Sequence, residues 1–142
     1  MTPFVEIYDI FLHSLKSDDL IDQWMEDPET VEAKFYDMLM TSAIVHFKGC
    51  NKDLTKHDDT SFNAELNEEE KRILALGMKY EYLSTVVIPN ENLVRDKFYT
   101  KDYQWFSPNA KMKNLLTVEE NTKRNLKNAI RLYQYYNKIR GV

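Results

Sequence analysis

The chain has 142 residues, among them 3 Gly, 4 Pro and a single Cys, so it fits one domain without an internal disulfide. Glycine and proline this scarce leave no regular series of hairpin turns, which disfavours a multi-stranded sheet and favours helices. The formal net charge of −4 combines two opposite halves, because residues 1–70 carry 5 Lys and Arg against 17 Asp and Glu, whereas residues 71–142 carry 14 against 6.

This separation of charge has two explanations. The acidic and basic halves either face each other within one fold, or each meets opposite charge on another molecule. Met1 is followed by acidic and apolar residues in place of a basic signal-peptide region, and no apolar stretch approaches the ~18 residues of a membrane span. With only one Cys, we therefore expect an intracellular protein that does not enter the membrane.

The first half predicts two helices. A short amphipathic helix is expected from Thr2 to about Leu15, with an apolar stripe at helical spacing made of Phe4, Ile7, Phe11 and Leu15. A second is expected over about 28–48, because Asp27 and Pro28 form a typical helix start and Gly49 a typical stop. Its predicted stripe is Val31, Phe35, Met38, Leu39, Ser42, Val45 and Phe47.

The next residues predict a long loop and then a third helix. Residues 49–66 show neither helical nor strand periodicity and are longer than most connections, which is typical of functional or disordered loops. Asn67 and Glu70 then have the spacing of a capping box, and Pro89 ends the helix, which we expect over about 68–88. Its predicted stripe is Ile73, Leu74, Leu76, Tyr80, Leu83 and Val87.

The last third predicts a short helix over 90–99 and a long one over about 108–139, which starts at Ser107-Pro108 and measures about 45 Å at 1.5 Å per residue. The apolar stripe of the long helix is Met112, Leu115, Leu116, Leu126, Ala129, Ile130 and Tyr133. Residues 117–125 are polar nearly all round, so we expect a bend there or a projection beyond the core. The predicted fold is all-α, a single domain over 1–142, with four to five helices in a bundle.

No catalytic or metal motif emerges from the sequence. His46, His57, Asp58 and Asp59 have metal-ligand character, but their spacing matches no dedicated motif, and His46 fits the end of a helix whose dipole favours a cation. Cys50 follows Gly49 and precedes Lys52, a setting that can lower the pKa of its thiol, yet no nucleophile signature surrounds Cys50. Phosphate-loop, dinucleotide, zinc-protease and serine-hydrolase motifs are absent from the sequence. We expect no enzyme activity, no metal and no cofactor.

Basic and aromatic residues mark the end of the chain as a candidate interface. The cations of the final helix are Lys111, Lys113, Lys123, Arg124, Lys127, Arg131, Lys138 and Arg140, interleaved with Tyr133, Tyr135 and Tyr136. Such a pattern fits nucleic acid, but acids of a neighbouring copy fit it better in a chain whose other half is acidic. Trp105 and Phe106, just before this helix, predict a core plug or an interface anchor.

Three segments of the chain carry a resemblance to a known family. They are S-A-I-V-H-F-K-G-C-N-K-D-L at 42–54, L-N-E-E-E-K-R-I-L-A-L-G-M at 66–78 with E-Y-L at 81–83, and S-P-N-A-K-M-K-N-L at 107–115. In this order, and leading into a basic final helix, they resemble the head-tail connector or adaptor proteins of tailed phages and prophages of Gram-positive bacteria. The resemblance covers about 30 to 136 and rests on packing and capping motifs.

The resemblance implies a helical subunit of a ring, commonly of twelve, that docks under the portal at the capsid vertex while DNA passes through the lumen. The implied partners are further copies of the chain, the portal protein and a tail-side neck or stopper protein, with only non-specific proximity to DNA. The implied location is the neck of the virion, after synthesis in the host cytoplasm. Opposite charge on two different surfaces would favour head-to-tail closure of such a ring.

Within this interpretation we predict the interface residues. The partner-facing cations are Lys123, Arg124, Lys127 and Arg131, the anchors are Trp105 and Phe106, and the opposing acidic surface is Asp18, Asp19, Glu26 and Asp27. A helix-in-groove contact with the portal would bury Leu126, Ile130, Tyr133 and Tyr136.

Two alternatives remain at this point. One is a small intracellular regulator whose acidic first half binds a host or phage protein, much as a nucleic-acid mimic would. The other is a DNA-binding protein that uses the final helix, whose affinity would fall steeply with salt. A connector should form rings and bind the portal, whereas a mimic should stay monomeric or dimeric and bind a basic partner.

Overall fold

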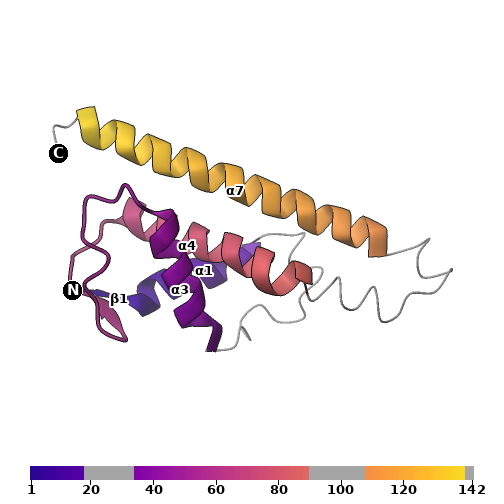
Figure 1. Ribbon diagram of the computed structural model, residues 1–142, viewed down its shortest axis with the longest axis horizontal. Coiled ribbons are helices and arrows are strands. Elements are labelled where there is room, and N and C mark those ends of the chain that lie inside the picture. The colour runs from indigo at the N-terminus through magenta and orange to yellow at the C-terminus, as the bar shows by residue number, and fades with distance from the viewer. Residues whose placement is uncertain (18–33, 90–107, 140–142) are drawn as a thin grey trace.

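The computed structural model describes residues 1–17, 34–89 and 108–139 (Figure 1). Four α-helices account for most of them: α1 (Phe4–Ser17), α3 (Lys34–His46), α4 (Glu68–Tyr82) and α7 (Pro108–Ile139). A π-helix, η2 (Leu83–Val87), continues α4, and two short strands, β1 (Thr2–Pro3) and β2 (Ser61–Phe62), pair with each other. The predicted all-α fold with a long C-terminal helix is confirmed.

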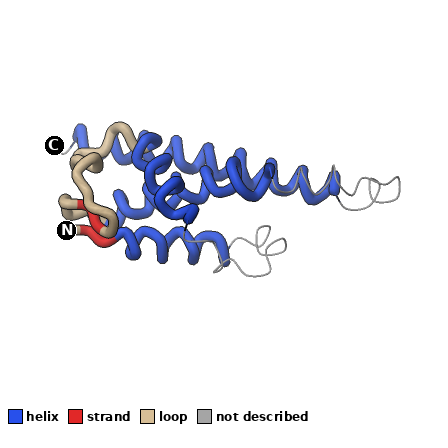
Figure 2. Tube along the Cα trace, turned by 60° about the horizontal axis from the view of Figure 1, so that its bottom comes forward, coloured by secondary structure: helices blue, strands red, loops and turns tan. Residues whose placement is uncertain are grey.

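Helix α4 lies at the centre of the bundle. It packs against α1, α3 and α7, and in both Figures 1 and 2 α7 runs along one side of α4 while α1 lies on the other. This position explains why α4 buries Ala75 and Met78 in addition to Ile73 and Leu74 of the predicted stripe. No helix within the described ranges is long and apolar enough to span a membrane.

Helix α1 buries the stripe predicted from its sequence. Phe4, Ile7, Phe11 and Leu15 are all buried, so the helical spacing identified the correct face. The helix begins at Phe4, because Thr2 and Pro3 instead form β1, which pairs antiparallel with β2. The hydroxyl of Thr2 donates to the Ala64 carbonyl at 2.8 Å and accepts the Leu66 N–H at 2.8 Å, which ties the start of the chain to the segment before α4.

The segment 49–66 is ordered and packed, contrary to one of the two predictions made for it. Leu54, Phe62 and Leu66 are buried, and the rings of Phe4 and Phe62 meet edge to face at 4.7 Å between centroids. The segment therefore closes one end of the bundle. The sequence pattern missed this role because its buried side chains lie at irregular spacing.

The predicted face of α3 is partly wrong. Met38 and Val45 are exposed, whereas the buried residues of this stretch are Leu39, Met40, Ala43 and Phe47. The reason is a close approach of α3 to α4: a Cβ placed on Gly77 would lie only 3.1 Å from the Cβ of Ala43. The contact thus passes through two small residues. The helix ends at His46, and the predicted turns over 28–33 lie outside the described residues.

Helix α4 starts with the predicted capping box but does not continue as an α-helix to 88. The Asn67 side chain accepts the Glu70 N–H, and the Glu70 side chain accepts the Asn67 N–H, each at 2.8 Å. After Tyr82 the chain forms the π turn η2, in which the Ile88 N–H donates to the Leu83 carbonyl. Within this stretch the Thr85 hydroxyl donates to the Glu81 carbonyl at 2.6 Å and so competes for an acceptor of the helical ladder.

Helix α7 runs unbroken over 32 residues, and its polar middle neither breaks the helix nor leaves the core. Val118 and Thr122 are buried there, and the Thr122 hydroxyl donates to the Val118 carbonyl at 2.7 Å. A threonine can thus face the core because its polar group is satisfied within the helix. Leu116, predicted to be in the stripe, is exposed. The short helix predicted over 90–99 lies outside the described residues.

Candidate interaction surfaces

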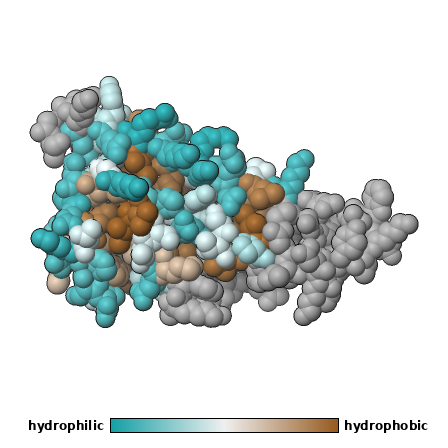
Figure 3. All heavy atoms as spheres, viewed as in Figure 1, coloured by the Kyte–Doolittle hydropathy of each residue, from teal (hydrophilic) through white to brown (hydrophobic). Residues whose placement is uncertain are grey.

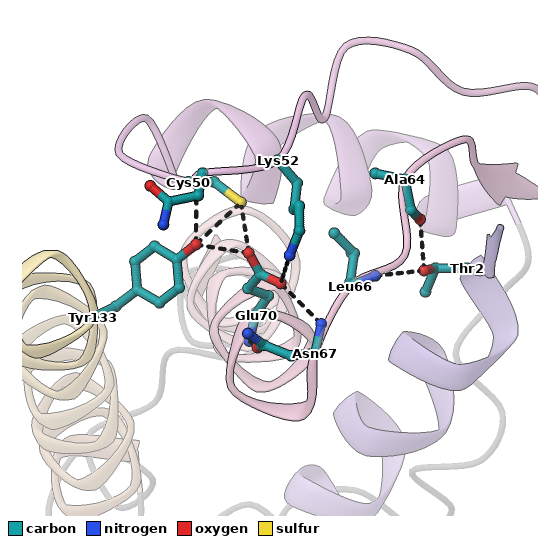
Figure 4. A network of polar contacts seen from close by, with 9 residues as sticks. Thr2, Cys50, Lys52, Ala64, Leu66, Asn67, Glu70 and Tyr133 are labelled. Carbon is teal, nitrogen blue, oxygen red and sulfur yellow. Dashed lines mark hydrogen bonds and ion pairs between the residues drawn. The ribbon is translucent and has the colours of Figure 1, made fainter. Parts of the chain in front are cut away.

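A buried polar network joins α7 to the beginning of α4 (Figure 4). Glu70 of α4 is fully buried, and its Oε2 accepts the Tyr133 hydroxyl of α7 at 2.6 Å. Its Oε1 accepts from the Lys52 ammonium at 3.1 Å and from the Asn67 N–H. The same Tyr133 hydroxyl accepts the Asn51 N–H at 3.0 Å. One carboxylate therefore fixes both helices to the segment that connects α3 with α4.

The network keeps the Glu70 carboxylate charged and the neighbouring Cys50 thiol neutral. Burial raises the pKa of Glu70, but the bonds from Tyr133, Asn67 and Lys52 outweigh burial and leave that pKa below its ordinary value. Burial also raises the pKa of the Cys50 thiol, whose Sγ lies 3.5 Å from the Glu70 Oε2. The prediction that the setting of Cys50 can lower its pKa is therefore wrong, because burial, together with the nearby charge of Glu70, raises it.

Two residues expected at a partner interface belong to the core of the chain itself. Tyr133 is 2% exposed and its ring packs edge to face on Phe47 at 5.0 Å, while Leu126 is 4% exposed. The prediction that Tyr133 and Leu126 face a partner is thus corrected, since helix α4 and the segment after α3 already cover them. Tyr136, by contrast, is 48% exposed, and Ile130 is half-buried.

The predicted cations of α7 whose side chains the structure describes lie on its solvent side. Lys113, Lys123, Arg124, Lys127 and Arg131 are exposed, and we call them the α7 basic face. None of the five forms an ion pair with any residue that the structure describes. The other predicted interface residues lie outside the described ranges: Asp18, Asp19, Glu26, Asp27, Trp105 and Phe106.

The ion pairs bear on whether the acidic and basic halves neutralise each other. In the described part of the chain, the pair that joins an acid of the first half to a cation of the second half across the fold is formed by the Glu6 carboxylate and the Lys71 ammonium, at 3.0 Å. It links α4 to α1 and leaves α7 untouched. As far as the structure describes the chain, the acidic half does not neutralise the α7 basic face.

His46 and His57 have structural partners. The Nε2 of His46 lies 2.6 Å from the Oε1 of Glu81, which places a potential cation at the end of α3 as predicted. The His57 ring packs on Phe4 and Phe62, at 5.6 and 5.8 Å between centroids. The Asp58 carboxylate accepts backbone N–H groups of its own turn. No group of three metal-ligating side chains occurs among the residues described.

Two surface features went unnoticed in the sequence. One is a hollow of ≈ 390 Å³ at the C-terminal end of α3, lined in part by Ile44, Val45 and Leu54, where Figure 3 shows hydrophobic surface. The other is a pair of stacked rings between α1 and α3, Tyr8 and Tyr36, with centroids 4.5 Å apart and planes 13° from parallel. Tyr8 and Tyr36 lie on different helices, so a pattern within either helix alone could not have predicted that their rings meet.

Comparison with known proteins identifies no family. No protein-family model, no curated protein and no solved structure matches this chain.

Proposed function

We propose that this chain is a structural protein, a head-tail connector whose copies assemble into a ring on the portal and join the capsid vertex to the tail. The proposal starts from the resemblance in the sequence. In it, the protein acts by assembling with other subunits and not by catalysing a reaction. We propose accordingly that it is not an enzyme. Its site of action would be the neck of the virion, with DNA passing through the ring.

The observation that supports this proposal most directly is the α7 basic face. A helix of 32 residues, held to the bundle through Tyr133 and Glu70, presents five cations that have no ion-pair partner in the described structure. Unpaired charge on one ordered surface favours contact with an acidic surface of another molecule. The first half of the chain carries such acidic residues in excess.

The proposal predicts that assembly depends on these cations. Reversing Lys127 and Arg131 to Glu should weaken self-association at least tenfold, because two attractive charges become repulsive at the contact. Reversing Asp18 and Asp19 to Lys in the same chain should restore part of it. Light scattering across concentration and salt measures the assembled mass, and a matched control reverses Lys48 and Lys56, which are exposed cations outside α7.

Binding to the portal is measured separately, by mixing the purified chain with a cognate portal and sedimenting the mixture. Ring-sized particles, or a complex formed only with the portal, would support the connector. A monomer that ignores both salt and portal would contradict it and favour the acidic regulator.

A further inference from the structure

We propose that the seam formed by Tyr8, Asp9, Tyr36 and Asp37 binds arginine side chains of a second copy, supplied by Arg124 and Arg131 of the α7 basic face. This inference rests on the proposed function, because it takes the α7 basic face as a self-assembly surface. It adds the surface to which the α7 basic face binds, and this surface is formed by residues of α1 and α3.

The seam combines stacked aromatic rings with unpaired carboxylates. Tyr8 and Tyr36 stack at 4.5 Å and remain partly exposed, and Asp9 and Asp37 beside them are exposed. Neither carboxylate forms an ion pair with a residue in the described ranges. A guanidinium is the group that such a site fits best, since it stacks on aromatic rings and donates hydrogen bonds to two carboxylate oxygens in one plane.

The two carboxylates lie close enough to the tyrosines to influence them. Burial, followed by the charge of Asp37, raises the pKa of Tyr8 to about 12, and burial followed by Asp9 raises that of Tyr36. Both hydroxyls therefore stay neutral near pH 7, and the negative charge of the seam comes from the two aspartates alone. Each aspartate acts on the tyrosine of the other helix, which agrees with the direct stacking of the two rings between α1 and α3.

The α7 basic face has the complementary chemistry. Arg124 forms no hydrogen bond or ion pair with another described residue, and the hydrogen bond of the Arg131 side chain goes to Asn128 on its own helix. The two arginines are seven residues apart, which is two helical turns, so both point to the same side of α7 and lie about 10 Å apart along the axis. Lys127 lies between them and adds charge of the same sign.

The two surfaces belong to different helices, and no ion pair joins them within one chain as far as the structure describes it. Helix α4 separates α1 from α7, as Figures 1 and 2 show from two directions. A contact between two different surfaces is heterologous, and it repeats from copy to copy, giving a ring where the rotation between copies closes and a filament where it does not. The seam and the α7 basic face are thus the two surfaces that meet in one repeating contact.

Four chains test this contact by sedimentation: the wild type, D9K/D37K, R124E/R131E and the combination of all four substitutions. Each double variant alone should lose at least tenfold in association, because like charges then face each other. The combined chain should associate again, and so should an equal mixture of the two double variants, since each supplies the surface that the other needs. The control variant D59K/E69K makes the same change of charge on exposed acids outside the seam and should assemble as the wild type does.

Several outcomes would overturn the inference. Normal assembly of D9K/D37K together with failure of R124E/R131E would show that another acidic surface receives α7, and the proposed connector would stand. Loss of duplex DNA binding in R124E/R131E with unchanged self-association would assign the α7 basic face to DNA. A wild-type chain that stays monomeric at every concentration would also overturn it. If assembly needs the seam but the chain never binds a portal, the inference stands and the connector function fails.

Discussion

Glu70 shows how one buried carboxylate can remain charged in the core. Four donors reach its two oxygens, from Tyr133, Lys52, the backbone of Asn67 and, at 3.5 Å, the thiol of Cys50. Buried charges persist in proteins when they are paired and hydrogen-bonded in this way. The side chain serves both as half of the capping box and as the link to α7.

Removing the Tyr133 hydroxyl tests this link. We expect Tyr133→Phe to lower the free energy of unfolding by about 1–3 kcal/mol, since both Glu70 and the Asn51 N–H lose a partner in a buried site. Urea unfolding measures the change. Tyr135→Phe on the same helix removes a hydroxyl from an exposed side chain and should change little; equal effects in the two variants would contradict the role of the network.

The charge of Glu70 also predicts a dependence of stability on pH. Because its pKa in the folded protein lies below the ordinary value near 4.5, Glu70 contributes stability that is present above pH 4.5 and lost as the pH falls through the folded pKa. Glu70→Gln should therefore flatten the loss of stability between about pH 5 and pH 3 relative to the wild type. Parallel pH curves for the two chains would show that Glu70 does not titrate in this manner.

The sequence predicted the local part of this site and missed the rest. The Asn67–Glu70 capping box spans three residues, so a short pattern identifies it. The partners Lys52 and Tyr133 lie 18 and 63 residues from Glu70, and no local pattern connects them. For the same reason the sequence assigned Tyr133 to a partner surface, since a tyrosine on a helix has the same spacing in a core and in an interface.

At the scale of elements, the close packing of α3 on α4 depends on Gly77. A Cβ at this position would meet the Cβ of Ala43 at 3.1 Å and its Cα at 3.2 Å. Gly77→Leu should therefore destabilise the fold by about 1–3 kcal/mol through overpacking, in spite of the better helix propensity of leucine.

Chemical denaturation of Gly77→Leu measures this effect, with a substitution to Leu at Asn121, an exposed position inside α7, as the control. A Gly77→Leu chain as stable as the wild type would mean that α3 can move away from α4 without loss. The same contact explains why the predicted face of α3 was partly wrong. Apolar residues at helical spacing indicate a buried face, but the close contact between Ala43 and Gly77 rotates the buried face of α3 away from the predicted one.

Some elements were predictable because their signals are local. The stripe of α1 and the bounds of α7 follow from apolar spacing, from Pro108 and from the absence of proline and glycine before Gly141. The burial of Val118 and Thr122 could not be predicted, because a polar stretch does not reveal that a threonine hydroxyl can donate a hydrogen bond to a carbonyl of its own helix. The pairing of β1 with β2 joins residues almost sixty positions apart and has no short-range signature.

At the scale of the whole molecule, the core divides into a large cluster and a small one. The small cluster consists of Ile88 and Leu115 with Val87 packed against them, and it joins η2 to the first part of α7. The large cluster contains Val118, Leu126 and Tyr133 of the same helix. A region with few buried apolar contacts opens at lower free energy than the main core.

We therefore expect amide hydrogen exchange to be faster around Leu115 than around Leu126, although both lie inside one continuous helix. Exchange measured by mass spectrometry on the intact chain resolves the two regions. Leu115→Ala should widen the difference, whereas Leu116→Ala, at an exposed neighbour, should leave it unchanged. Uniform protection along α7 would show that the helix unfolds as a unit with the main core.

The π turn of η2 has a consequence for insertions and deletions. A π turn carries one residue more than an α-helical turn over the same length, so it corresponds to an α-helix with a single-residue insertion. Deleting Thr85 would remove this extra residue and let the α-helical ladder run on from Tyr82, and the side chains after it would keep nearly their present direction, because the shorter α-helical turn rotates the chain about as far as the π turn does. Ile88 would then still face Leu115, so the chain would gain regular hydrogen bonding and keep its small cluster. The π turn thus absorbs one residue of length without changing the direction in which the chain leaves α4.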